Sequence, residues 1–369
     1  MQLRSLTVSN FKNISGATLD FSPKINCFLG DNGMGKSNLL DAIHFLSFCR
    51  SFTGVPDSLV VKNTEDFMIA KGIYRRRDTD EELLMAIQKG KRKSLKRGGK
   101  EYSRLSEHIG LFPVVLASPA DTELAKGPSE ERRRWMDMVI SQENRPYLEA
   151  LIRYSNSLRQ RNRLLRDGIS DPSLYGAIEM QMAMAEKIIT PARKIWTLRL
   201  TERVGHYYRE IAGDVSEAPV IGYRAGYTGE SFERALGENR RRDEFMRHTT
   251  VGPHRDDIEM ELNGMPLRRT ASQGQTKTFT TALRLAQYDF LRESCGIKPL
   301  LLLDDIFDKL DSNRVEKIMK LVTSPDFGQI FITDTNRKHL DDIIGLTEGD
   351  RRLWAVTNGN FSLIDSAAS

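Results

Sequence analysis

The chain has 369 residues, enough to bury a large core and to form about two domains. Its formal net charge of +5 favours an anionic partner only weakly, so the distribution of charge says more than the sum. The three cysteines are far apart and form no C-x-x-C pair, which argues against a zinc site or a disulfide framework and predicts buried free thiols in a reducing cytosol.

The beginning of the chain is typical of a strand. Its apolar positions include Leu3, Leu6 and Val8, a pattern unlike that of a signal peptide. No apolar run anywhere in the sequence reaches 18 residues, as a membrane-spanning helix requires. We therefore expect a soluble, cytoplasmic protein that makes no membrane contact.

A phosphate-binding loop follows the first strands. Residues 30–37 read G-D-N-G-M-G-K-S and match the pattern G-x4-G-K-[ST], between an apolar strand over residues 25–29 and an amphipathic helix. The glycines let backbone N–H groups point at phosphate oxygens, and the helix N-terminus faces the same anion. Lys36 is expected to reach the β and γ phosphates and to take part in catalysis, and Ser37 is expected to hold Mg²⁺. The predicted nucleotide-binding residues are Gly30, Asp31, Asn32, Gly33, Met34, Gly35, Lys36, Ser37 and Asn38.

Two basic segments follow. Residues 75–99 are predicted to form a charged hairpin excursion, and residues 89–104 hold eight basic side chains and one acidic one. Residues 132–166 hold nine arginines and three acidic residues, and arginine without lysine suits phosphate contacts better than mere solubility does. A solvated helix face remains the alternative for any single arginine. Arg161 is expected to point elsewhere and to pair with an acid or face the core. The predicted DNA-binding residues are Arg132, Arg133, Arg159 and Arg163.

Residues 126–250 have a helical pattern. Apolar residues in 148–165 and again in 178–189 roughly follow helical spacing. Pro172 and Pro191 are expected to break these helices. The methionines expected in the core or in helix packing, rather than on a binding surface, are Met180, Met182 and Met184.

After residue 257 the period returns to two. Residues 258–267 predict a β-hairpin, because Asn263-Gly264 favours a type I′ turn. Residues 271–275 read A-S-Q-G-Q before an amphipathic helix and resemble the ABC signature L-S-G-G-Q. The pentapeptide alone is a weak signal, since any serine-capped helix resembles it. The residues predicted to bind nucleotide here, at a second helix N-terminus, are Ser272, Gln273, Gly274 and Gln275.

A pair of carboxylates ends a later strand. Residues 300–305 read L-L-L-L-D-D, typical of a buried parallel strand, and ligands of open α/β sheets bind at such strand ends. Asp304 is predicted to hold Mg²⁺, and Asp305 is predicted to be the catalytic residue that orients or deprotonates the attacking water. Residues 309–311 follow at the spacing of an ABC D-loop, and a last strand is expected over residues 330–333.

The phosphate loop, the signature segment and the Asp-Asp strand with its D-loop, in this order along the chain, are highly specific for one class of ATPase. With residues 10–13 (N-F-K-N) and 252–257 (G-P-H-R-D-D), they resemble the RecF family of bacterial DNA-repair ATPases, which is related to the heads of SMC and Rad50. The resemblance implies an α/β fold, namely an ABC-type P-loop ATPase head with an inserted, mainly helical lobe and no long coiled coil. The head would comprise residues 1–125 and 251–369, and the arginine-rich lobe residues 126–250.

Three departures from the ABC pattern matter. Gln273 stands where the ABC signature has glycine, no Q-loop glutamine appears near residues 118–121, and Thr333-Asp334-Thr335 contains no switch histidine. The last two leave the γ-phosphate sensors unassigned. His254 is open to two interpretations, a hydrogen-bonded turn histidine or a functional one.

The resemblance also implies a function. It implies ATP and Mg²⁺ as cofactors and an ATP-dependent, head-to-tail homodimer with two ATP molecules between the chains. The implied partners are duplex DNA, the junctions beside single-strand gaps, and the proteins RecR and RecO. The chain would be an ATP-dependent DNA clamp that helps to load recombinase, with weak, DNA-stimulated ATP hydrolysis as its release switch. The alternatives are an SMC- or Rad50-like structural tether, an ABC-type ATPase subunit of another system, and a DNA-binding module with a vestigial nucleotide site.

Overall fold

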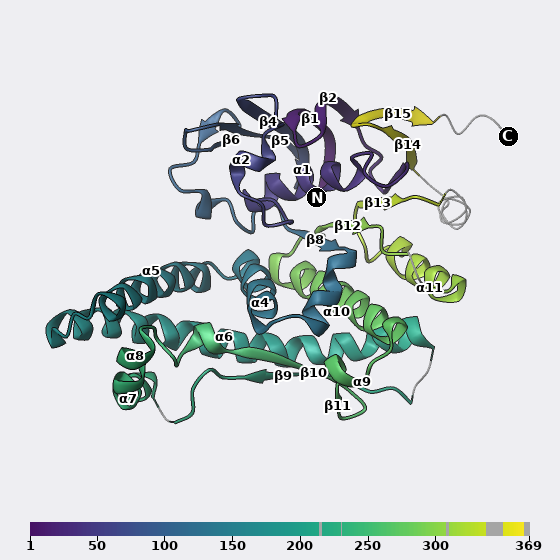
Figure 1. The fold of residues 1–369 in the computed structure, drawn as a ribbon. Coiled ribbons are helices and arrows are strands. Elements are labelled where there is room, and N and C mark those ends of the chain that lie inside the picture. Colours follow the sequence, from purple (N-terminus) through teal and green to yellow (C-terminus); the bar gives the residue numbers. More distant parts are fainter. Residues whose placement is uncertain (214–215, 230, 308–309, 337–349, 365–369) are drawn as a thin grey trace. The chain divides into compact units, whose positions relative to one another are not determined.

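The computed structural model describes residues 1–213, 216–229, 231–307, 310–336 and 350–364 (Figure 1). The chain divides into two compact units, one of residues 1–119 with 291–369 and the other of residues 120–290. These boundaries differ from those predicted for a head and a lobe. The signature segment 271–275 falls in the second unit, whereas the phosphate loop and the Asp-Asp strand fall in the first. The assignment of a head and a lobe stays a prediction.

The first unit contains a mainly parallel sheet. Its spatial order is β15 (Asn360–Ile364), β14 (Arg351–Thr357), β3 (Ile25–Leu29), β13 (Ile330–Asp334), β12 (Leu300–Asp304) and β8 (Val114–Ala117). Only β15 runs antiparallel to its neighbour. All five residues of β12 and of β13 are buried, as the continuous apolar runs predict for central parallel strands. The strands predicted over 25–29, 300–304 and 330–333 are therefore confirmed.

A second sheet in this unit is antiparallel. Its order is β2 (Ile14–Asp20), β1 (Gln2–Phe11), β4 (Phe67–Arg76), β5 (Thr79–Gln88), β6 (Ser94–Arg97) and β7 (Lys100–Glu101). The charged excursion is confirmed as a hairpin, because β4 and β5 join through Arg77 and Asp78, both with positive φ. The helices of this unit are α1 (Lys36–Phe48), α2 (Asp57–Val60), α11 (Ser312–Thr323) and the 3₁₀ turn η1 (Leu105–Glu107). Cys27 and Cys49 are buried free thiols, as expected.

The second unit is mainly helical. Its helices are α3 (Thr122–Lys126), α4 (Ser129–Glu143), α5 (Arg145–Asp167), α6 (Pro172–Ala212), α7 (Phe232–Glu238), α8 (Arg240–Met246), α9 (Leu267–Thr270) and α10 (Gln273–Cys295), with η2 (Pro119–Asp121) and η3 (Pro253–Arg255). Its small sheet has the order β11 (Met265–Pro266), β10 (Asp257–Leu262) and β9 (Pro219–Arg224). The predicted hairpin is confirmed, since Leu262 pairs with Met265 and the Asn263-Gly264 turn has two positive φ angles.

Two helices form most of the length of this unit. α5 and α6 pack against each other (Figure 1), and both have side-chain caps at their start. Asn144 accepts a hydrogen bond from the N–H of Tyr147, and Asp171 accepts from the N–H groups of Ser173 and Leu174. The predicted break at Pro172 is confirmed, because α5 ends at Asp167 and Pro172 occupies the first turn of α6.

Pro191 does not break a helix, contrary to the prediction. It lies inside α6, which continues for 41 residues. Proline leaves the carbonyl of residue 187 without its helical partner. Pro191 and Lys187 are both on the outer side of the helix, so water can satisfy that carbonyl, while Ile189 and Trp196 are buried and hold the helix in place. Burial of the inner face outweighs the lost hydrogen bond.

The methionines of α6 divide between its two faces. Met182 is fully buried, as expected, but Met180 and Met184 are 60% and 63% exposed, so the prediction that all three pack in the core is wrong for these two. The outer face also carries Ile195 and Leu198, which are 57% and 73% exposed. The solvent side of α6 therefore carries several exposed apolar side chains beside charged ones such as Lys187.

Candidate nucleotide site and DNA-contacting residues

The phosphate loop connects β3 to α1 by a turn that requires glycine. Gly33 and Gly35 have φ angles of 81° and 108°, in the left-handed region. A Cβ on Gly35 would lie 2.9 Å from Oδ1 of Asn13, and one on Gly30 would lie 2.3 Å from the carbonyl oxygen of Val356. Asp31, Asn32 and Gly33 are exposed. The loop therefore has little space for side chains at its base and an open rim.

Lys36 lies over this loop. Its Nζ donates hydrogen bonds of 2.5 Å and 3.0 Å to the carbonyl oxygens of Gly30 and Asp31. Burial lowers the pKa of Lys36, whereas the carboxylates of Asp305 and Asp304 oppose that shift. The ammonium group is thus held where the loop backbone curves, the position that the motif predicts for contact with phosphates.

The sheet register brings the loop to the Asp-Asp pair. The Oγ of Ser37 donates a hydrogen bond of 2.8 Å to Oδ1 of Asp304, and the hydroxyl of Thr333 donates to the same oxygen over 2.8 Å. β12 and β13 are parallel neighbours with Asp304 opposite Thr333. Burial raises the pKa of Asp304, Asp305 adds to that rise, and the two hydroxyl hydrogen bonds oppose it.

Asp305 begins the turn after β12. Its φ of 49° is in the left-handed region, which a non-glycine residue adopts at a cost of about 1–3 kcal/mol. Its N–H donates to the carbonyl and hydroxyl oxygens of Thr333, at 3.2 Å and 3.0 Å. Thr333 therefore contacts both predicted carboxylate residues. The motifs in the sequence assign Thr333 no role, and a hydroxyl at the end of the neighbouring strand is the one signal that points to it.

The chemistry of this cluster suits a magnesium ion. Ser37 and Asp304 offer hard oxygen ligands, and Mg²⁺ is commonly bound by one or two such groups together with phosphates and water. Within the described ranges, no group of three or more His, Cys, Asp or Glu side chains is placed to hold a metal.

Asn13 supports the loop from the turn between β1 and β2. Its Oδ1 accepts a hydrogen bond of 2.7 Å from Nδ2 of Asn38, and its own Nδ2 donates to the carbonyl of Gly33 at 3.4 Å. Beside it, Lys12 forms an ion pair of 2.6 Å with the buried Asp41 of α1. The N-F-K-N segment thus fixes the start of α1, a role that the sequence did not reveal.

The signature segment forms a reciprocal helix cap. The Oγ of Ser272 accepts from the N–H of Gln275 at 3.1 Å, and Oε1 of Gln275 accepts from the N–H of Ser272 at 2.9 Å. Nε2 of Gln275 also donates to Glu217 over 2.5 Å. Ser272 and Gln273 are exposed, and Gly274 follows in the first turn of α10. In the predicted D-loop, Lys309 lies outside the described residues.

Of the four predicted DNA-binding arginines, one is buried and one is half-buried in the second unit. Arg132 is only 7% exposed and holds Asp257 with hydrogen bonds of 2.7 Å and 3.0 Å, while its Nη1 donates to the carbonyls of Leu124 and Gly127. Arg133 is partly buried and donates to Ser129 and to the carbonyl of Asp256. The prediction that Arg132 contacts DNA is therefore corrected: its donors already have acceptors inside the protein.

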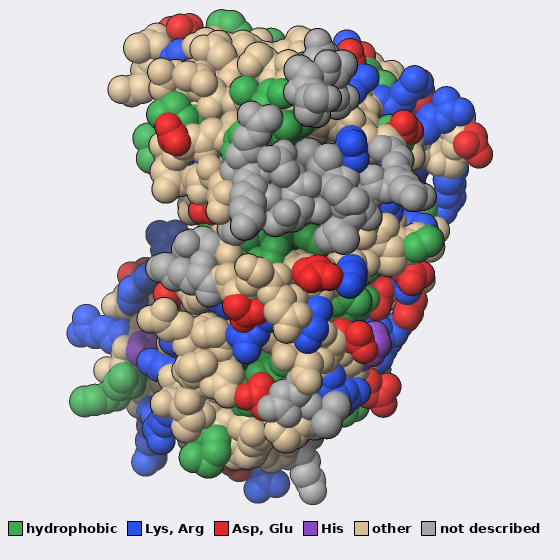
Figure 2. All heavy atoms as spheres, turned by 90° about the vertical axis from the view of Figure 1, so that its right-hand side faces the viewer, with side chains coloured by type: hydrophobic (Ala, Val, Ile, Leu, Met, Phe, Trp, Pro, Cys, Tyr) green, Lys and Arg blue, Asp and Glu red, His purple; other side chains and the backbone are tan. Residues whose placement is uncertain are grey.

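The other two arginines lie on the outer face of α5. Arg159 and Arg163 are exposed, and Arg163 makes a solvent-exposed ion pair of 3.6 Å with Asp167. Arg161 is fully buried and pairs with Glu179 and Asp243 at 2.9 Å and 2.7 Å, as predicted for a residue that points elsewhere. On another face of the molecule, which Figure 2 shows, basic and acidic side chains are interspersed.

His254 is held on both sides of its ring. Nδ1 lies 2.7 Å from the hydroxyl of Tyr154, and Nε2 lies 3.0 Å from the carbonyl oxygen of Thr249. Burial is the main cause that lowers the pKa of His254 to about 4. The geometry favours the hydrogen-bonded turn histidine over the functional one.

None of the helices in the described ranges has the length and apolar character needed to cross a membrane.

Comparisons with known proteins place the chain in a family. Residues 2–351 match the RecF/RecN/SMC N-terminal domain family. The chain is 47% identical over 359 residues to the DNA replication and repair protein RecF of Parabacteroides distasonis, a match that covers 97% of this chain and 98% of the relative. It is 45% identical over 361 residues to the protein of the same name from Bacteroides fragilis strain YCH46, with 97% of each chain covered.

Solved structures show the same fold. The structure described as the recombination mediator protein RecF-ATP in the RecFOR pathway superposes with a TM-score of 0.88 at 30% identity, covering 99% of this chain and 98% of that one. An Smc head domain from Pyrococcus furiosus superposes with a TM-score of 0.58 at 16% identity, covering 98% and 96%. The fold is thus that of an ABC-type ATPase head, and the chain belongs to the RecF family of DNA replication and repair proteins.

Proposed function

We propose that this protein is an ATP-dependent DNA clamp of recombinational repair. ATP joins two copies of the chain on duplex DNA beside single-strand gaps, where the dimer helps to load recombinase, and hydrolysis releases it. The observation that carries the proposal is the hydrogen bond between Ser37 of the phosphate loop and Asp304 of the Asp-Asp strand. The names of the relatives support it, and so does the likeness to the solved structure described as RecF-ATP.

The nucleotide site would work with a few side chains. Lys36 would exchange its bonds to the loop carbonyls for the β and γ phosphates, and Ser37 and Asp304 would hold Mg²⁺. The ion, when bound, neutralises phosphate charge. Asp305 would orient the attacking water or accept its proton. An aspartate is one methylene shorter than the glutamate usual in such sites, which favours slow turnover and a switch.

Dimerisation would use the signature in trans. The exposed Ser272 stands at the start of the 23-residue helix α10, where backbone N–H groups and the helix dipole favour an anion. In ABC-type ATPases this motif completes the ATP site of a second subunit. We assign that part to Ser272, Gln273, Gly274 and Gln275, so that ATP acts as the contact between two chains.

DNA binding is assigned to the exposed arginines of α5. Arg159 and Arg163 lie four residues apart and so share a face of the helix. Contacts from such side chains go mainly to phosphates, and binding should depend little on base sequence. RecR and RecO are proposed as protein partners because the similar solved structure is described as part of the RecFOR pathway.

One experiment tests the whole proposal. The mass of the protein in solution is measured without nucleotide, with ATP and Mg²⁺, and then with gapped duplex DNA. We expect a monomer, an ATP-dependent dimer, and a dimer–DNA complex in turn. A mass that ATP leaves unchanged, with DNA bound equally well in its absence, would instead identify a DNA-binding module with a vestigial nucleotide site.

A further inference from the structure

A short helix of the second unit carries an unusual exposed surface. In α8, Phe245 is 86% exposed and the adjacent Met246 is 46% exposed. Arg241 and Arg242 precede them and Arg247 follows, all exposed. Within the described parts of the chain, these three guanidinium groups make no ion pair or side-chain hydrogen bond. A large aromatic ring therefore lies in solvent among unpaired positive charges.

Helical geometry places these side chains together. Arg241 and Phe245 are four residues apart and Arg242 and Phe245 three, so all three share one face of α8. Asp243 is fully buried and points to the opposite face, about 160° from Phe245 at about 100° per residue. The buried side anchors the helix, and the exposed side presents the ring between arginines. Glu244 is the one exposed acid on this helix.

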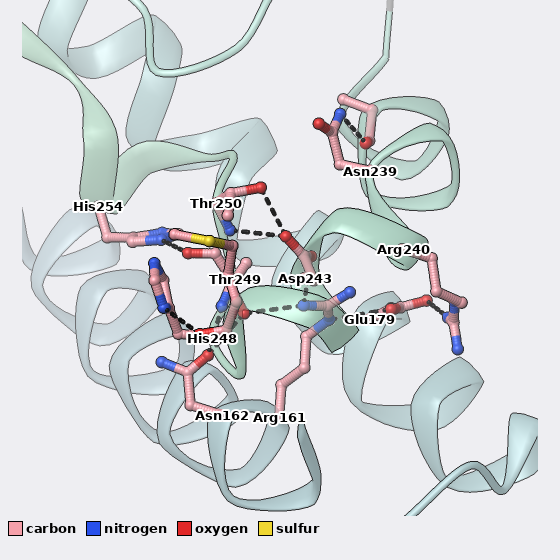
Figure 3. Close-up of polar contacts among 12 residues, drawn as sticks. Arg161, Asn162, Glu179, Asn239, Arg240, Asp243, His248, Thr249, Thr250 and His254 are labelled. Carbon is pink, nitrogen blue, oxygen red and sulfur yellow. Dashed lines mark hydrogen bonds and ion pairs between the residues drawn. The ribbon is translucent and has the colours of Figure 1, made fainter. Parts of the chain in front are cut away.

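The buried anchor is a network of charged and polar groups (Figure 3). Asp243 accepts a hydrogen bond of 2.7 Å from Nη1 of Arg161, and further ones from the N–H and hydroxyl of Thr250 at 2.9 Å and 2.5 Å. Arg161 also bonds to Thr249 at 2.8 Å, and Thr249 bonds through its N–H and hydroxyl to Asn162. Because breaking such a network leaves buried charges unpaired, α8 is held firmly against α5.

A second contact fixes the beginning of the helix. Nη2 of Arg240 donates to Glu179 of α6 over 2.7 Å, and the guanidinium of Arg240 lies 4.5 Å from the ring centre of Tyr175. Glu179 also accepts from Arg161, so one carboxylate ties α8 to both long helices. Phe245 is thus an exposed ring on a helix held in place by two sets of contacts, so a ligand that binds it need not order the backbone that carries it.

From this arrangement we propose that Phe245, with Arg241, Arg242 and Arg247, forms a binding site for single-stranded DNA. An unpaired base stacks on the Phe245 ring, and the arginines contact the flanking phosphates. This inference rests on the proposed function, in which the protein meets DNA beside a gap. It adds a contact to the unpaired strand, separate from the duplex contact on α5.

The chemistry favours nucleic acid over a protein partner. The exposed side chains here are one phenylalanine and one methionine among three arginines and a single glutamate, an excess of positive charge that suits a polyanion. Non-specific single-strand sites combine basic side chains with aromatic rings in this way. Arg159 and Arg163 each stand two positions from Arg161, which faces α8, so they point away from this patch. The two surfaces can therefore be changed independently.

The test compares two DNAs that differ only in an unpaired extension. Affinities are measured by fluorescence anisotropy with ATP for a blunt duplex and for the same duplex with a single-stranded overhang of either polarity. Phe245→Ala should weaken binding to one overhang DNA by about 5-fold to 150-fold, the range for loss of one stacked base. Binding to the blunt duplex should change by less than about twofold, since a paired base offers no face to the ring.

Further variants separate the contributions. Leu198→Ala removes another exposed apolar side chain, on α6, and should leave both affinities unchanged. The double variant Arg241→Ala, Arg242→Ala should make the slope of log K against log salt for the overhang DNA shallower by roughly 1.4, about 0.7 per lost contact. Unchanged melting temperatures confirm that the variants fold.

The outcomes distinguish this inference from the proposed function. If Phe245→Ala binds overhang DNA as wild type does, or loses equal affinity for the blunt duplex, the stacking site is disproved and the ring is left to a protein partner. An unchanged salt slope in the arginine double variant also overturns the proposal. If wild-type protein with ATP binds neither DNA, the proposed function fails first.

Discussion

The hydroxyl of Ser37 donates a hydrogen bond of 2.8 Å to Oδ1 of Asp304 across 267 positions of the sequence. One residue is the last of the phosphate loop and the other ends a buried strand, and the parallel register of β3, β13 and β12 brings both to the same sheet edge. A hydroxyl and a carboxylate in contact offer two oxygen ligands to a magnesium ion. Changes at this cluster should therefore affect nucleotide binding and hydrolysis, whereas changes to the arginines of the second unit should affect DNA binding or stability.

Replacement of Lys36 by methionine should abolish ATP binding. The change keeps the length of the side chain and removes the charge that would contact the β and γ phosphates. The fold should persist, because the hydrogen bonds of the ammonium group go to loop carbonyls. Its removal therefore breaks no hydrogen bond to a carboxylate. Calorimetric titration with ATP measures the effect, with exposed Lys126→Met as the control. Wild-type ATP affinity in Lys36→Met would refute the phosphate-loop assignment.

Asp305→Asn should separate ATP-dependent dimerisation from ATP hydrolysis. The amide keeps the shape of the side chain but cannot accept a proton, so an ATP-bound dimer should accumulate while hydrolysis falls by about 10²-fold or more. Asp304→Asn is the comparison: it should weaken Mg²⁺ and ATP binding, because it alters a ligand bonded to Ser37. Phosphate release and solution mass are measured together. Normal turnover in Asp305→Asn would transfer the role to another group.

Ser272→Arg should block dimerisation and spare ATP binding. The substitution places bulk and charge where the γ-phosphate of the partner subunit would lie. Ser272→Thr is the matched control, since it keeps the hydroxyl that caps α10 through Gln275. Light scattering with ATP gives the mass, and calorimetry gives the affinity of the single chain. A dimer of Ser272→Arg as stable as that of wild type would exclude a signature that acts in trans.

The double variant Arg159→Ala, Arg163→Ala should weaken duplex DNA binding with little dependence on sequence. If both side chains contact phosphates, the slope of log K against log salt becomes shallower by roughly 1.8, about 0.9 per contact. Arg134→Ala, an exposed arginine on α4, is the control. Anisotropy at several salt concentrations measures the slope. An unchanged slope would show that the duplex binds elsewhere, with the basic segment at residues 89–104 as the next candidate.

Arg161→Ala should act through stability rather than through DNA. Removal of Arg161 leaves Asp243 buried without its ion pair, and such losses cost about 3–5 kcal/mol. We expect a lower urea midpoint and, in protein that remains folded, an unchanged salt slope. A variant with wild-type stability and a shallower slope would show instead that Arg161 reaches the DNA.

The protein should lose stability as the pH falls from about 6.5 towards 4, partly because of His254. Burial lowers the pKa of this histidine from 6.5 to about 4, so the unfolded chain takes up a proton that the folded chain does not. The free energy of unfolding is not reduced by this histidine well above pH 6.5, where it is neutral in both states. By about pH 5 the free energy of unfolding should have fallen by about 2 kcal/mol on its account. His108, lowered to about 4 for the same reason, acts in the same direction. Urea unfolding is measured above pH 6.5 and at about pH 5. The free energy of unfolding should fall less between them in His254→Gln than in wild type, and an equal fall would contradict this account.

Local patterns in the sequence determined many of the elements and the assignment of the candidate nucleotide site. Four leucines before Asp304, the glycines before Lys36 and the Asn263-Gly264 turn each restrict their own backbone, so the strands, the phosphate loop and the hairpin could be predicted. The order of the motifs was enough to indicate the family. These features depend on residues that are neighbours in the chain.

Only the tertiary structure decided which similar residues differ in role. Arg132 and Arg159 both read as arginines on a helix, but Asp257, 125 positions away, holds Arg132 inside the unit while Arg159 remains in solvent. Pro191 continues a helix because its outer face is open to water, and Phe245 lies exposed because the opposite face of α8 is anchored by Asp243. Burial depends on partners distant in sequence, and no local pattern records which side of a helix they cover.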